Sequence, residues 1–282
     1  MIIIEPHIHM YSRTTDDYTA MYRGGIRACV EPSFWLGTNR RYAGTFWDYF
    51  RLILEFEPTR AERYGVDHYA GVAVNPKEAE DLALANEVIE GMGPYLEHPR
   101  CVAIGEIGFN LITPHEETVF QRQLEIAKAR QMLILIHSPH DTPTVSKRKG
   151  VERTLAILRE LNYDDGRIVL DHNTENTMDL ARRRPVWAGL TVYPYSKLNP
   201  ARVAEILKKW GIERTLVNSS ADWGVSDPAS LPKVAAHLRE SGFSEEQIRA
   251  LLFDNPMAFY RQERRFHPRL DLPYQDPAQY QR

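Results

Sequence analysis

The chain has 282 residues, of which 43% are hydrophobic and 26% are charged, and it contains no stretch near the roughly 18 consecutive apolar residues of a membrane span. Its 35 basic and 38 acidic residues give a formal net charge of −3. The net charge of the whole protein therefore does not attract a polyanion, and any nucleic-acid binding must be local. The N-terminus lacks the basic start and cleavable apolar segment of a secretory signal, and we therefore expect a cytoplasmic protein.

Short β-branched runs alternate with longer segments of helical periodicity, which predicts βαβ units and a parallel sheet. Eight such runs occur, at residues 2–9, 26–32, 68–74, 102–108, 132–138, 167–172, 186–193 and 214–221. Eight strands that are each followed by a helix predict a (β/α)8 TIM barrel, an α/β fold, built as a single domain from residues 1–266. An open doubly wound sheet is the alternative that this pattern leaves open.

Helix starts are marked by an Asn or Asp before a proline, because the side chain caps free amides while proline tolerates the first helical position. Such pairs stand at residues 75–76, 199–200, 227–228 and 255–256. Two capping boxes, Thr113 with Glu116 and Ser244 with Gln247, predict two further starts.

Two segments fall outside this alternation. Residues 33–65 form an aromatic insertion between the second and third strands, where we expect a helix together with a lid or a contact between subunits of a homo-oligomer. Residues 267–282 contain three prolines and little periodicity, so we expect an extended arm packed on the surface or on a neighbour.

Five of the predicted strands carry histidine or acidic residues where the apolar run stops, and these residues are His7 and His9, Glu106, His137, His172 and Asp222. A strand's period of two points His7 and His9 to the same face. Burial of such groups without partners would cost several kcal/mol, which disfavours a purely structural role. Imidazole and carboxylate groups at the catalytic face of a barrel suit Zn²⁺, Mn²⁺ or similar ions, so the pattern predicts a metal site.

The order of these residues, with Gly105-Glu106-Ile107-Gly108 and Ile136-His137-Ser138 around two of them, resembles the TatD-related branch of the amidohydrolase superfamily. The resemblance extends to residues 255–260, which are similar to that family's C-terminal helix. It implies two divalent metal ions (Zn, Mn or Mg) with Glu106 as their bridge. One ion is then held by His7, His9 and Asp222, and the other is held by His137 and His172.

This geometry implies a metal-activated water. Two cations roughly 3.5 to 4 Å apart lower the pKa of a shared water toward about 7, so that it attacks a carbonyl or phosphorus centre. We expect Asp222 to act as the catalytic proton shuttle. The predicted activity is hydrolysis of a small ester, phosphoester, lactone or amide.

Several motifs depart from the family pattern, and they bear on the substrate. The Arg that usually follows the fifth-strand histidine is absent from the sequence His137-Ser138-Pro139-His140, and its loss removes a bidentate phosphate contact. A deoxyribonuclease of the TatD kind is therefore the second hypothesis, and a metal-bound barrel that serves a biosynthetic assembly without catalysis is the third. The residues predicted to contact a small-molecule substrate are His140, Asn173, Glu175, Tyr193, Tyr195 and Trp223.

Overall fold

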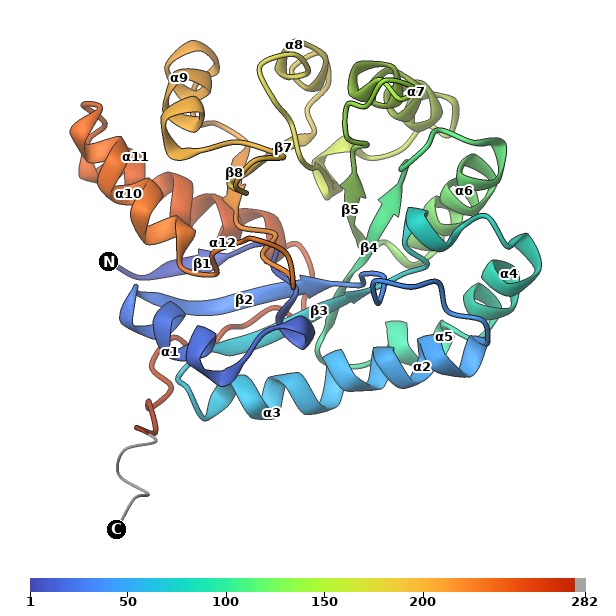
Figure 1. Ribbon diagram of the computed structural model, residues 1–282, viewed down its shortest axis with the longest axis horizontal. Helices are drawn as coiled ribbons and strands as arrows, with labels where there is room; N and C mark the ends of the chain where they lie inside the picture. The colour runs from blue at the N-terminus through green and yellow to red at the C-terminus, as the bar shows by residue number, and fades with distance from the viewer. Residues whose placement is uncertain (277–282) are drawn as a thin grey trace.

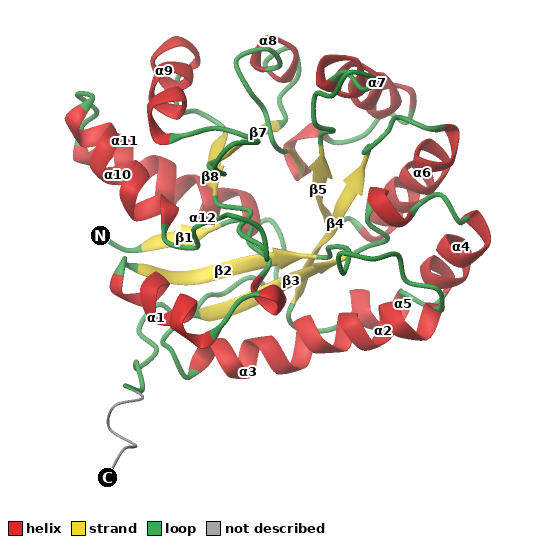
Figure 2. Ribbon diagram, in the orientation of Figure 1, coloured by secondary structure: helices red, strands yellow, loops and turns green. Residues whose placement is uncertain are grey.

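Eight parallel strands form the centre of the molecule in a computed structural model that describes residues 1–276. They hydrogen-bond in sequence order. The strands are β1 (Ile3–Glu5), β2 (Ile26–Pro32), β3 (Asp67–Val72), β4 (Cys101–Gly108), β5 (Leu133–His137), β6 (Ile168–Leu170), β7 (Trp187–Thr191) and β8 (Thr215–Asn218). Figures 1 and 2 show them curving into a nearly closed barrel with helices around it, which confirms the predicted (β/α)8 TIM barrel.

The helices surround the strands. The α-helices are α1 (Thr15–Arg23), α2 (Ala43–Arg51), α3 (Glu57–Glu62), α4 (Leu82–Glu90), α5 (Gly93–Leu96), α6 (Pro114–Arg130), α7 (Lys147–Glu160), α8 (Met178–Ala181), α9 (Pro200–Trp210), α10 (Ser230–Glu240), α11 (Glu245–Arg249) and α12 (Asn255–Tyr260). The 3₁₀ turns are η1 (Met10–Ser12), η3 (Pro76–Glu78) and η4 (Asp165–Arg167), and the π-helical turns are η2 (Leu52–Phe56) and η5 (Ala250–Asp254). No helix within residues 1–276 is both long and apolar enough to cross a bilayer.

Most of the predicted helix starts are confirmed, because the capping side chains accept bonds from the first free amides. Thr113, Asn199 and Ser244 do so at α6, α9 and α11, and Asn75 caps the short turn η3. Two predicted starts are wrong.

The first wrong start is at Asp227. Its side chain accepts from Ala229 N in a turn, and α10 begins only at Ser230. The second is at Asn255, which lies inside a helical segment that runs unbroken from α11 through η5 to α12. The Asn255 amide donates to the carbonyl oxygens of Ile212 and Thr215 and so ties this segment to β8.

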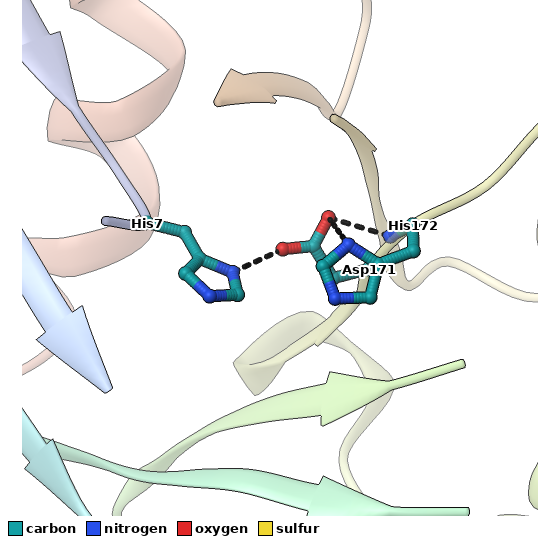
Figure 3. Close-up of side chains that lie close together, drawn as sticks. All are labelled: His7, Asp171 and His172. Carbon is teal, nitrogen blue, oxygen red and sulfur yellow. Dashed lines mark hydrogen bonds and ion pairs between the residues drawn. The ribbon is translucent and has the colours of Figure 1, made fainter. Parts of the chain in front are cut away.

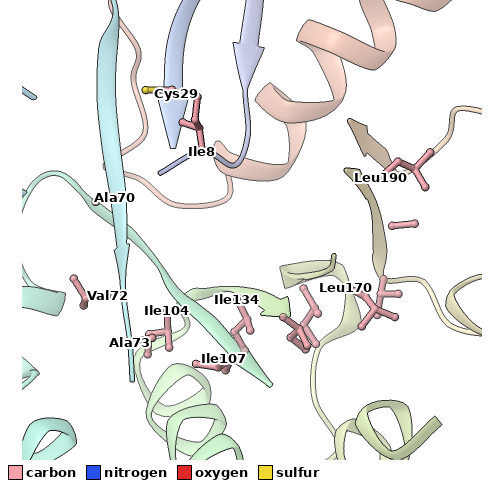
Figure 4. Close-up of a cluster of buried hydrophobic side chains, with 14 of the residues drawn as sticks. Ile8, Cys29, Ala70, Val72, Ala73, Ile104, Ile107, Ile134, Leu170 and Leu190 are labelled. Atoms are coloured by element: carbon pink, nitrogen blue, oxygen red, sulfur yellow. The ribbon is translucent and has the colours of Figure 1, made fainter. Parts of the chain in front are cut away.

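Buried apolar side chains pack on both faces of the parallel strands, as expected for a sheet covered by helices. One cluster includes Ile104, Ile134 and Leu170, which Figure 4 shows together. A second cluster includes Ile4 of β1 together with Phe259 and Tyr260 of α12. The sheet is therefore shielded from water except where its strands end.

The seam between β8 and β1 is closed by the segments that follow these strands. Ser220 N donates to His7 O at 2.8 Å, and His9 N donates to Ala221 O at 2.9 Å. The buried Glu5 carboxylate accepts from His7 N at 3.1 Å and from Ser219 N at 3.2 Å. The backbone contacts that close the barrel thus involve His7 and His9, whose side chains lie at its mouth.

The aromatic insertion contains the helical stretch formed by α2, η2 and α3, which runs along one side of the barrel in Figure 1. The C-terminal segment packs beside it: Arg269 N donates to Asp67 at 2.9 Å, and Tyr274 forms an isolated antiparallel bridge with Tyr64. The last part of the predicted arm, residues 277–282, lies outside the described residues.

Candidate metal centre

Five buried side chains converge where the strands end. His7 and His9 follow β1, Glu106 lies in β4, His137 is the last residue of β5, and His172 follows β6. They form the overlapping groups His7–His9–Glu106 and Glu106–His137–His172, in each of which the potential ligand atoms lie within 4.8 Å of one another. The structure thus brings together five of the six residues predicted to bind metal.

The His7 and His9 rings are oriented by acceptors on their far sides. His7 Nδ1 lies 2.6 Å from the carboxylate of Asp171 (Figure 3), and His9 Nδ1 lies 3.2 Å from the carbonyl oxygen of Pro32. Both partners are acceptors, so each Nδ1 donates and each neutral ring keeps a lone pair on Nε2. The two Nε2 atoms are 3.2 Å apart.

His172 is oriented in the same way. Its Nδ1 lies 2.7 Å from Thr191 Oγ1, and because that hydroxyl donates to Asp171 it must accept from His172. The lone pair of His172 Nε2 then faces Glu106 Oε1 at 3.1 Å. His137 Nδ1 lies 3.2 Å from the same oxygen.

This donor set fits divalent cations. Imidazole lone pairs and a carboxylate at such separations repel one another unless a positive charge lies between them. Two contacts are of this kind. One joins His7 Nε2 to His9 Nε2, and the other joins His172 Nε2 to the Glu106 carboxylate. Nitrogen and oxygen ligands of this kind suit zinc, manganese and similar ions.

Burial keeps the histidines in their ligand form. It lowers the pKa of His9 and His172 well below the ordinary value, and it also lowers the pKa of His137. Burial opposes ionisation of Glu106, but the neighbouring His7 and His137 outweigh this effect and hold its pKa well below the usual range. Neutral imidazoles around an ionised carboxylate are the protonation states that metal binding requires.

Asp222, the sixth predicted ligand, lies beside this cluster rather than within the two groups. Its Oδ1 accepts hydrogen bonds from Tyr193 Oη at 2.7 Å and from Gly224 N at 2.6 Å. Its backbone carbonyl accepts from Arg13 at 2.7 Å. These contacts hold the Asp222 carboxylate in the wall of a cavity that Glu106, His137 and His172 also line.

The cavity has a volume of about 540 Å³, and three of the five converging residues, Glu106, His137 and His172, line it. Four of the residues predicted to contact substrate line it, namely His140, Tyr193, Tyr195 and Trp223. The His140 ring lies 6.0 Å from that of His137, and burial, followed by the proximity of His137, lowers the pKa of His140 to about 3. A neutral His140 therefore faces the cavity at physiological pH.

The structure places the other two predicted substrate residues elsewhere. The Asn173 amide is fully buried, donates to Leu170 O at 2.6 Å and accepts from the Thr177 hydroxyl at 3.0 Å. The Glu175 carboxylate pairs with Arg202 at 2.6 Å. Among the described residues that line the cavity, neither Asn173 nor Glu175 occurs, and a substrate contact by either stays a prediction.

Sequence reasoning missed Asp171 and two cavity lysines, Lys77 and Lys197. Asp171 Oδ1 accepts from His172 N at 2.6 Å, and both its oxygens accept from the Asn218 amide at 3.0 Å. Burial opposes its ionisation, but His172 and His7 outweigh burial and hold the pKa of Asp171 well below the usual range. The one available signal was its place next to His172 at the end of an apolar run.

Comparison with known proteins agrees with this site. The sequence matches the family described as TatD related DNase over residues 7–261. It is 30% identical over 266 residues, 92% of this chain and 100% of the relative, to an uncharacterized metal-dependent hydrolase of Methanocaldococcus jannaschii.

Solved structures give the same result. A TatD-like protein from Archaeoglobus fulgidus superposes with a TM-score of 0.74 at 27% identity, covering 92% of this chain and 99% of that one. A PTE-like lactonase mutant from Deinococcus radiodurans superposes with a TM-score of 0.64 at 16% identity, covering 92% of this chain and 95% of that one. The second similarity establishes the shared barrel fold only.

Proposed function

The chain belongs to the TatD-related DNase family of metal-dependent hydrolases, and from this premise we propose a binuclear enzyme that cleaves a small ester, phosphoester, lactone or amide. The observation that carries the proposal is the convergence of four buried imidazole rings on the Glu106 carboxylate. We infer that His7, His9 and Asp222 would hold one ion and that His137 and His172 would hold a second, with Glu106 as a ligand available to both.

Bound divalent cations would polarise the scissile group and lower the pKa of water, which is the chemistry that such ions supply. The chain's own groups perform the remaining tasks. The Asp222 carboxylate accepts the proton of the attacking water, while the Tyr193 hydroxyl and Gly224 amide hold the carboxylate in place. The aromatic and lysine side chains of the cavity wall exclude bulk water and position the substrate.

Elemental analysis and a substrate panel test this proposal. We expect purified protein loaded with Zn²⁺, Mn²⁺ or Mg²⁺ to bind about two equivalents per chain and to hydrolyse at least one class of ester, phosphoester, lactone or amide. His9→Asn and Glu106→Gln should each lower the metal content and abolish turnover. His267→Asn is the matched control, because His267 is exposed on the C-terminal segment.

Three results would contradict the proposal. A protein whose metal content stays below one equivalent under saturating metal has no binuclear site. Variants of His9 and Glu106 that keep both metal and activity would remove these residues from the site. Two equivalents of metal without turnover across the panel would favour the third hypothesis, a binding subunit without catalysis.

The nuclease alternative is supported by the family to which the chain belongs. Single-stranded and double-stranded oligonucleotides therefore join the panel, at low and high salt. Cleavage of oligonucleotides at rates above those for every small substrate would establish the nuclease. Failure to bind them at any ionic strength would dismiss it.

A further inference from the structure

Three lysines line the cavity from three different strand-to-helix connections. Lys77 lies in η3 after β3, Lys147 begins α7 after β5, and Lys197 lies between β7 and α9. Because every second connection contributes one, the ammonium groups approach the cavity from several sides rather than as one surface patch.

None of these lysines has a carboxylate oxygen within 4.0 Å in the described part of the chain, and the groups that they contact are neutral. Lys147 Nζ donates to His172 O at 2.8 Å, Lys197 Nζ donates to Ser220 Oγ at 3.2 Å, and Lys77 Nζ lies 4.4 Å from the centre of the Trp35 ring. Arg202, which also lines the cavity, is paired with Glu175. The three lysine ammonium groups are thus available to pair with an anionic group of a ligand that enters the cavity.

An aromatic wall adjoins the lysines. The Trp223 ring lies 5.2 Å from Phe34 and 5.7 Å from Trp35, and Trp223 is 44% exposed. All three rings line the same cavity as Lys77 and Lys197. An apolar wall of mutually inclined rings beside ammonium groups that lack a carboxylate partner fits a ligand that has an apolar part and an anionic part.

We propose that the cavity binds a small substrate that carries an anionic oxygen group, a carboxylate or a phosphate, in contact with Lys77 and Lys197. The apolar part of this substrate packs on Trp35 and Trp223. Lys147 is buried against the His172 carbonyl and contributes its charge from behind the wall. The inference rests on the proposed function, because it takes the cavity above the metal ligands to be the substrate site.

Isothermal titration calorimetry on metal-loaded protein tests the inference without turnover. The probes are benzoate, phenylphosphonate and the neutral benzamide, which has nearly the shape of benzoate. We expect at least one anion to bind at least tenfold more tightly than benzamide. Whichever anion binds more tightly distinguishes a carboxylate from a phosphate as the recognised group.

Lysine variants then distinguish anion binding by the lysines from anion binding by the metal ions. Lys77→Met and Lys197→Met should each weaken anion binding about tenfold, as loss of a charged hydrogen bond does, with metal content unchanged. Lys149→Met should bind like the wild type, because Lys149 is exposed on α7 and lies outside the cavity lining.

Two results would overturn the inference: equal binding of benzamide and both anions, including no binding of any probe, or unchanged anion affinity in both cavity variants. The second result would assign anion binding to the ions alone. Metal content is measured on the same samples and hydrolysis in separate assays. Intact lysine-dependent anion binding without turnover would therefore reject the hydrolase proposal while leaving this one standing.

Discussion

Asp171 Oδ2 accepts a hydrogen bond of 2.6 Å from His7 Nδ1, and this contact joins the end of β6 to the segment that follows β1. The same carboxylate accepts from His172 N and from the Asn218 amide. One buried carboxylate therefore sets the ring orientation of His7 and the position of His172. A carboxylate behind a ligating histidine also raises its basicity toward a metal.

We expect Asp171→Asn to lower metal affinity by about 10- to 100-fold. An asparagine presents a donor where each Asp171 oxygen now only accepts, so at least one neighbouring donor loses its partner, at a cost of about 1–3 kcal/mol. Titration with a competing chelator measures the affinity, and urea unfolding of the metal-free protein measures the stability. Wild-type metal affinity in this variant would show that His7 needs no such support.

Gly189→Ala tests the same carboxylate by steric means. A Cβ at Gly189 would lie 2.1 Å from Asp171 Oδ1, so the carboxylate must shift. We expect metal affinity to fall by at least tenfold, as in Asp171→Asn. Gly44→Ala in α2 is the control, because its Cβ would meet nothing within 4 Å; equal metal affinity in the two glycine variants would contradict the prediction.

Tyr193→Phe removes the hydroxyl that donates to Asp222 at 2.7 Å, while Gly224 N still donates to the same oxygen. We expect metal content to persist and kcat to fall about tenfold, because the proton acceptor is less well positioned. Asp222→Asn should lower kcat by about 10² to 10⁴. Tyr42→Phe, at a side chain that is 71% exposed and lies outside the cavity lining, should change kcat less than twofold. An Asp222→Asn enzyme with both metals and full turnover would refute the proton-transfer role.

Glu5→Ala removes the carboxylate that bridges His7 N and Ser219 N across the β1–β8 seam. Because two buried amides lose their acceptor, we expect the free energy of unfolding to fall by about 2–4 kcal/mol. Glu213→Ala, at an exposed position, should change it by less than about 0.5 kcal/mol. Urea unfolding measures both, and similar values for the two variants would show that the seam needs no carboxylate.

Glu31 makes stability depend on pH. Burial raises its pKa from 4.5 to about 8, so the folded chain keeps a proton that the unfolded chain releases. The free energy of unfolding should therefore fall as pH rises from about 5 to 8, by on the order of 2–4 kcal/mol from this group.

Glu31→Gln should lessen that dependence, because the amide stays neutral at every pH in the window and still offers an acceptor to Tyr11 N. Glu5, whose pKa burial also raises to about 8, keeps its own contribution. Urea unfolding of metal-free protein at pH 5, 6, 7 and 8 measures the slope. Glu87→Gln, at an exposed position on α4, should keep the wild-type slope. An unchanged slope in Glu31→Gln would show that Glu31 is ionised in the folded chain.

Local signals in the sequence explain what could be predicted. The eight strands were recognisable because each apolar run is short and is followed by helical periodicity, and His137 marks the last residue of β5 as expected. Local signals also explain the errors. Asn255 has the sequence context of a helix cap, but its amide is used for bonds to Ile212 and Thr215, about 40 residues away.

By itself the sequence determined the barrel, the family and the set of polar residues at the strand ends, because periodicity and spacing are properties of neighbouring residues. Only the tertiary structure decided which groups face one another. Asp171 meets His7 across 164 positions of chain, and Lys77 shares a cavity with Lys197, because closing the barrel brings its strand ends to one mouth. Contacts of that range depend on the curvature of the whole sheet, which no local pattern encodes.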